Sequence, residues 1–117
     1  MEFTDTERVI LWLALEGASG IWEAAWDIKS QGLVTEDVAV AQAMTDTKKL
    51  LGLGLIELYS QQEVADDETL VADGDAFGIL DNVVNWTPPG GDRSRPMYLL
   101  AGTDAAAELL GYPKPGN

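Results

Sequence analysis

The feature that most constrains this chain is a change of hydrophobic period at Gly52-Leu53-Gly54. Before this point, apolar residues recur at the three- and four-residue spacing of amphipathic helices. After it, residues 55–59 form a short apolar run bounded by glycine and by polar residues, which is typical of a strand. Glycine suits such a junction because the chain leaves a helix there in a left-handed conformation. We therefore expect helices followed by a small sheet.

Three helices are predicted before the junction. The first, at residues 4–16, opens on the spacing of a capping box, in which the Thr4 hydroxyl and the Glu7 carboxylate satisfy backbone N–H groups reciprocally. The second is expected at residues 19–30, with its first residue, a serine, as the N-cap. The third is expected at residues 35–52, with acids in its first turn and lysines in its last, as the helix dipole favours.

The elements predicted after the junction are short and are separated by glycine, proline and acidic residues. In chain order they are a strand at 69–72 inside an exposed acidic segment, a short helix over 76–86, a loop at 87–92, a strand at 96–101 and a helix at 105–110 capped by Thr103 or Asp104. Four tryptophans, Trp12, Trp22, Trp26 and Trp86, are interpreted mainly as core. A dimer or partner surface is the alternative for Trp22 and Trp26, which share one helix face.

This order of elements resembles a winged helix-turn-helix domain. Residues 49–58, KLLGLGLIEL, are similar to the junction where the third helix of that family gives way to the first wing strand. Residues 98–103, followed by 105–110, are similar to a second wing strand that runs into a C-terminal helix. The segment between the two strands, residues 60–95, is far longer than an ordinary wing and is expected to hold an added helix.

The resemblance implies a mainly helical α+β fold. The fold that it implies has three N-terminal helices, two or three short antiparallel strands with an enlarged wing segment, and a C-terminal helix. A single winged-helix-like domain is expected over residues 1–111, since this length suits one domain, with a flexible tail over residues 112–117. The family's function implies DNA binding through the third helix and the wing.

The sequence contains no histidine and no cysteine. This excludes a histidine general base, a thiolate nucleophile and metal sites built on either residue. Asp73-Gly74-Asp75 resembles the start of a calcium loop, but the ligand positions after it hold Phe77 and Val84. We therefore expect no enzymatic activity, no cofactor and no metal site, and an enzyme that uses carboxylates alone is the weakest hypothesis.

The formal net charge is −13, from 20 acids and 7 bases. Such a charge repels phosphate backbones and attracts basic surfaces, although its simplest consequence is solubility. We predict a basic protein as the partner, as for immunity proteins, antitoxins and inhibitors, with a solvated loop as the alternative role for the acids. The carboxylates predicted to form the partner-binding surface are Glu63, Asp66, Asp67, Glu68, Asp73, Asp75 and Asp81.

A winged-helix transcriptional regulator is the second hypothesis, and such regulators commonly bind DNA as dimers. It would use the scarce bases Lys48, Lys49, Arg93 and Arg95, but the third helix begins with Glu36 and Asp37, where DNA-reading helices usually carry basic or amide side chains. The N-terminus lacks the basic stretch of a secretion signal, and no apolar run is long enough to span a membrane. We therefore expect a cytoplasmic protein with no membrane partner. A homodimer is one hypothesis for its assembly.

Overall fold

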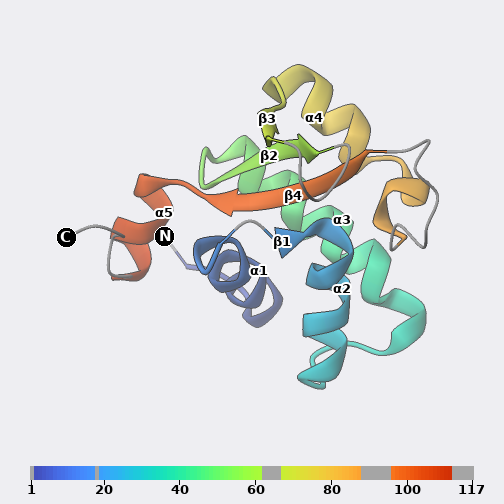
Figure 1. Cartoon of the computed structure of the whole chain (residues 1–117). Coiled ribbons are helices and arrows are strands. Elements are labelled where there is room, and N and C mark those ends of the chain that lie inside the picture. Colours follow the sequence, from blue (N-terminus) through green and yellow to red (C-terminus); the bar gives the residue numbers. More distant parts are fainter. Residues whose placement is uncertain (1, 18, 62–66, 88–95, 112–117) are drawn as a thin grey trace.

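The computed structural model describes residues 2–17, 19–61, 67–87 and 96–111, which form a mainly helical α+β structure with a four-stranded antiparallel sheet (Figure 1). The three N-terminal helices, the added helix and the C-terminal helix are confirmed. Their order along the chain is α1 (Asp5–Leu15), β1 (Ser19–Gly20), α2 (Ile21–Ser30), α3 (Glu36–Gly52), β2 (Ile56–Gln61), β3 (Thr69–Leu70), α4 (Asp73–Leu80), the 3-10 helix η1 (Val83–Trp86), β4 (Met97–Gly102) and α5 (Asp104–Leu110).

The predicted capping box at the start of α1 is present. The Glu7 N–H donates to the Thr4 hydroxyl at 3.2 Å, and the Thr4 N–H donates to Glu7 Oε1 at 2.8 Å. Both bonds join residues three apart in sequence, which is why local spacing was enough to predict them.

The prediction for the second helix was wrong at its start. Ser19 is not its N-cap, because Ser19 and Gly20 form strand β1 and the helix begins at Ile21. The Ser19 hydroxyl donates to the carbonyl oxygens of Leu13 and Gly17. The Gly20 N–H is satisfied by Glu23 Oε2 at 2.7 Å, so a carboxylate in the first turn closes this helix end.

The helix-to-strand junction has the predicted geometry. Gly54 has φ +74°, the left-handed conformation that glycine adopts without a Cβ penalty. The Leu55 N–H still bonds the Leu50 carbonyl, at 3.1 Å, so the strand begins at Ile56 and not at Leu55. The Thr103 N–H then donates to the Leu55 carbonyl, which fastens the end of β4 to this turn.

The sheet has the strand order β1-β4-β2-β3. Two or three strands were expected, and the additional one is β1, which pairs with β4. β4 also pairs along its full length with β2, and β3 extends the other edge of β2. In Figure 1, β4 crosses the molecule from the side of the orange η1 to α5.

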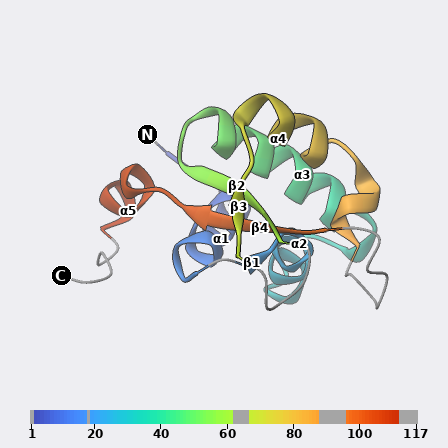
Figure 2. The ribbon, with the colours of Figure 1, turned by 45° about the horizontal axis from the view of Figure 1, so that its top comes forward.

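The helix expected over residues 76–86 is two helices. α4 starts at Asp73 and ends at Leu80, and η1 follows it. Asn82 separates them because its side-chain oxygen accepts the Val84 N–H at 3.1 Å and so caps η1. α4 lies along the C-terminal half of α3 (Figure 2), where the Phe77 ring approaches Gly52.

The core lies between α1, α2, α3 and the inward face of the sheet. Ile56 and Leu58 on β2 and Leu100 on β4 point into it and are almost completely buried. Trp86 is also buried, and its indole N–H donates to the Leu80 carbonyl at 2.9 Å. None of the helices in the described ranges is both long and apolar enough to cross a bilayer.

The core interpretation of the tryptophans was right for Trp86 and wrong for two others. Trp12 is 40% exposed and Trp26 is 54% exposed, so neither is a core residue. Trp22 is partly buried and packs at the edge of the core. Helical spacing placed Trp22 and Trp26 near each other on α2 but could not show which residues lie opposite them.

Candidate functional site

A row of side chains crosses the outward face of the sheet. Because side chains alternate along a strand, Tyr59 points away from the core, opposite to its buried neighbour Leu58. Tyr59 is directly paired with Leu99 on β4 and with Leu70 on β3. Directly paired residues share a face, so these three side chains form a continuous row, which we call the outer row.

The outer row continues to β1 through Gly20 and Trp22. Gly20 pairs with Leu99, and a Cβ on Gly20 would lie 2.4 Å from ring carbons of Trp22. The absence of a side chain at this position therefore allows the indole of Trp22 to lie over the β1 backbone. Leu99 is only 8% exposed, while Leu70, at the other end of the row, is 55% exposed.

Two carboxylates lie beside Tyr59. Glu57 is on the same face of β2, two residues before Tyr59, and Glu68 immediately precedes β3. Burial raises the pKa of the Tyr59 hydroxyl, and the charge of Glu57, a hydrogen bond with its side chain and the charge of Glu68 raise it further. The charged groups that raise the pKa of the Tyr59 hydroxyl are both carboxylates, so Tyr59 lies beside negative charge.

Four of the acids predicted for the partner-binding surface lie in the described residues before β3 and at the start of α4. Asp67, Glu68, Asp73 and Asp75 are exposed, and none of them forms an ion pair within the described ranges. Asp73 and Asp75 are in the first turn of α4, where the helix dipole favours them, and not in a calcium-type loop. The exposed apolar side chains of Leu70 and Phe77 come from the same segment. The other two predicted acids of this segment, Glu63 and Asp66, lie outside the described residues.

Asp81, the last acid predicted for this surface, forms an ion pair with a lysine of its own chain. The Lys48 ammonium lies 2.7 Å from Asp81 Oδ1, and its hydrogen bond and charge hold the pKa of that carboxyl below its usual value. This ion pair joins the C-terminal half of α3 to the end of α4. Asp81 therefore faces a cation of its own chain, unlike Asp73 and Asp75.

The two lysines predicted for DNA binding are adjacent in sequence but extend toward different helices. Lys48 pairs with Asp81 next to α4, whereas Lys49 pairs with Glu7 of α1 at 2.8 Å. Arg93 and Arg95, the other two bases of that hypothesis, lie outside the described residues. At the opposite end of α3, Glu36 and Asp37 are exposed, and Lys29 lies 3.6 Å from Glu36.

The partner of Lys49 belongs to a buried polar contact between α1 and α3. Glu7 is almost completely buried; burial raises the pKa of its carboxyl, but hydrogen bonds from Lys49 and Thr4 and the Lys49 charge outweigh burial and leave that pKa below its usual value. Nearby, the Thr6 hydroxyl donates to Asp46 Oδ2 at 2.5 Å, and the Gln42 amide donates to Asp46 Oδ1 at 2.9 Å. This cluster ties the helices together.

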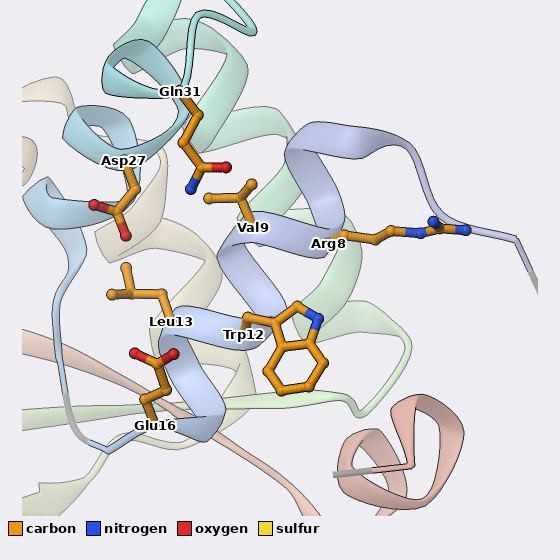
Figure 3. A pocket seen from close by; sticks show the side chains of 7 residues that line it. All are labelled: Arg8, Val9, Trp12, Leu13, Glu16, Asp27 and Gln31. Atoms are coloured by element: carbon orange, nitrogen blue, oxygen red, sulfur yellow. The ribbon is translucent and has the colours of Figure 1, made fainter.

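A groove of about 280 Å³ lies between α1 and α2, and none of the outer-row residues lines it (Figure 3). Val9, Trp12 and Leu13 of α1 are among the residues that line it. The Asp27 and Glu16 carboxylates turn toward each other on either side of Leu13. No three acidic side chains of the described ranges converge in a way that could hold a metal ion.

Reasoning from the sequence did not identify the outer row. The alternation of apolar and polar residues over 56–59 could have placed Glu57 and Tyr59 on one outward face. The pairing of Tyr59 with Leu99 and Leu70, by contrast, depends on strand register between distant segments.

A scan against protein-family models found no match for this chain, and searches of curated proteins and of solved structures found no significant similarity.

Proposed function

We propose that this chain is a winged-helix-like binding protein that engages a basic protein partner through the outer row and the acids beside it. The fold proposal is supported by the order of three helices, strand, insert, strand and helix, and by the antiparallel pairing of β2 with β4. These are the elements on which the resemblance to winged helix-turn-helix domains rests.

The observation that carries the functional proposal is the environment of Tyr59. An aromatic ring lies in an apolar row, and the two charged groups that act on it are the carboxylates of Glu57 and Glu68. An arginine or lysine of a partner would find a ring face for a cation–π contact and carboxylates for ion pairing. Leu70 and Trp22 supply apolar area on either side, as the centre of a protein interface requires.

The ion pairs that the lysines form within the chain also favour a basic protein partner over DNA. Lys29, Lys48 and Lys49 each pair with a carboxylate of their own chain, so a phosphate backbone would have to compete with these acids. Contacts from lysine and arginine to phosphates supply most of the non-specific affinity of DNA-binding proteins. The exposed start of α3 offers Glu36 and Asp37 in place of such groups.

We expect Glu68→Lys to weaken binding of an arginine-rich peptide probe by about tenfold, which corresponds to about 1.4 kcal/mol. The substitution reverses one of the two charges beside Tyr59. Isothermal titration calorimetry gives the affinity, and NMR chemical-shift perturbation of the amides of Tyr59, Leu70 and Leu99 locates the contact. Binding should weaken as salt is added, because exposed charges are screened.

Glu2→Lys is the matched control, because it makes the same change of net charge at an exposed position outside the outer row. Retention of wild-type affinity by Glu2→Lys, together with a loss in Glu68→Lys, supports a defined site. Equal losses in both variants would mean that only the net charge attracts the probe, and the proposal would then fail.

A DNA-binding regulator is the second candidate, favoured by the same arrangement of α3, β2 and β4. It predicts a mobility shift of random-sequence duplex DNA at about 50 mM salt, where electrostatic binding is strong. A shift that is lost in Lys48→Ala and Lys49→Ala would favour the regulator over the protein-binding module.

A further inference from the structure

We propose that a second copy of this chain docks on the groove between α1 and α2, with α1 of the two copies antiparallel about a two-fold axis next to Trp12. This surface is separate from the outer row, and the inference does not rest on the proposed function.

The groove presents two carboxylates to an incoming cation. Asp27 of α2 and Glu16 at the end of α1 face each other across the apolar side chain of Leu13 (Figure 3). Neither carboxylate forms an ion pair within the described ranges. A guanidinium, which is planar and can donate to two carboxylates at once, fits such a pair of acceptors better than a neutral group does.

The cation that fits is present on the same helix. The described basic residues are Arg8, Lys29, Lys48 and Lys49, and the three lysines pair with carboxylates of their own chain. Arg8 lines the groove but forms no ion pair among the residues that the structure describes, and its guanidinium extends outward from α1 on the side away from Asp27 (Figure 3). It is therefore placed to reach another molecule.

The spacing on α1 makes this surface complementary to itself. Arg8, Trp12 and Glu16 lie at intervals of four residues, along one side of the helix. Arg8 and Glu16 are about 12 Å apart along the axis at 1.5 Å per residue, and Trp12 is midway between them. A two-fold axis beside Trp12 brings Arg8 of each copy to Glu16 of the other, which is the pattern of an isologous interface.

Apolar groups occupy the centre of this arrangement. Trp12 is 40% exposed, and Val9 and Leu13 are half-buried in the groove. Exposed tryptophan between opposite charges matches the usual anatomy of an interface, with an aromatic centre and a polar rim. The net charge of −13 on each copy opposes association, so the contact should form at about 0.15 M salt, where the Debye length is about 8 Å.

Charge reversal tests the geometry. Arg8→Glu and Glu16→Arg are each expected to weaken self-association by about a hundredfold, because each reversal acts twice across the axis and like charges then face each other. An equimolar mixture of the two variants should form a heterodimer, since every reversed charge again meets its opposite. Sedimentation velocity of each variant and of the mixture measures both results, and a thermal melt checks that each variant is folded.

Asp75→Arg is the control, because it makes the same charge change as Glu16→Arg on α4. It should leave the dimer intact. Arg8→Gln and Glu16→Gln replace the reversed variants if either of these is unfolded, and each should still weaken the dimer. A wild-type chain that stays monomeric at its solubility limit would overturn the proposal, as would dimers that persist in both single reversals or a mixture that stays monomeric.

Discussion

Gly102→Ala is expected to lower the free energy of unfolding by about 2–3 kcal/mol, the cost of forcing atoms into a closely packed site. A Cβ on Gly102 would lie 2.4 Å from Leu15 Cδ2, 2.7 Å from Leu15 Cγ and 3.2 Å from Leu15 Cα. The last of these is a backbone atom, so a change of the leucine rotamer cannot relieve the whole conflict. The end of α1 would have to move away from β4. Equilibrium denaturation with urea, followed by circular dichroism, measures the change.

Gly78→Ala is the matched control. Gly78 is inside α4, and no atom lies within 4 Å of the position that its Cβ would occupy. Alanine should therefore stabilise the protein by about 0.5–1 kcal/mol, because it lowers the entropy cost of forming the helix. Equal effects of the two substitutions would show that α1 and β4 do not approach as closely as described.

Glu7→Ala is expected to destabilise the protein by about 2–3 kcal/mol, because one side chain makes three contributions. It closes the capping box of α1, it fills space between α1 and α3, and it pairs with Lys49. Loss of a helix cap costs about 1 kcal/mol, and truncation of a buried side chain adds to this. The Lys49 side chain is 56% exposed, so the ion pair itself supplies about 1 kcal/mol or less.

The pH dependence separates the charge of Glu7 from its shape. The pKa of the Glu7 carboxyl is lower in the folded protein than its ordinary value of 4.5. Its contribution to stability is therefore fully present above the unfolded-state pKa and is lost as the pH falls through the folded-state pKa. The stability difference between wild type and Glu7→Gln should shrink as the pH drops below about 4.5 and stay constant above it.

A double-mutant cycle with Lys49→Met gives the coupling energy of the pair. A difference between wild type and Glu7→Gln that does not change from neutral to acidic pH would contradict a lowered pKa. A vanishing coupling energy would show that Glu7 acts through the cap and packing alone.

Features that depend on neighbours in sequence were predicted well. The capping box, the glycine junction and the helical periods each follow from contacts within three or four residues, and the structure contains all of them. The short strand at Thr69 and the added helix were also foreseen, because changes of composition marked them. Errors at the element ends had different causes: the bond of the Leu55 N–H to the Leu50 carbonyl extends the turn before β2, and the pairing of Ser19 and Gly20 with β4 moves the start of α2 to Ile21.

Features that depend on distant neighbours were not predicted. β1 has only two residues, and its pairing with Leu99 and Leu100 cannot be detected from local propensity. Trp26 has the helical spacing of a core residue but is mostly exposed. Lys48 and Lys49 were considered as one basic patch, yet each is held by a carboxylate from a different helix.

By itself, the sequence determined the type and approximate extent of the helices, the helix-to-strand junction, the excess of negative charge and the absence of histidine and cysteine. Those properties come from the amino-acid composition and from interactions between residues that are close in sequence. Tertiary structure alone decided that Tyr59 lies between Leu99 and Leu70 and beside Glu57 and Glu68. Strand register and helix packing are set by the simultaneous burial of side chains from the whole chain. The sequence of one segment does not contain this information, because it does not show which distant side chains pack against that segment.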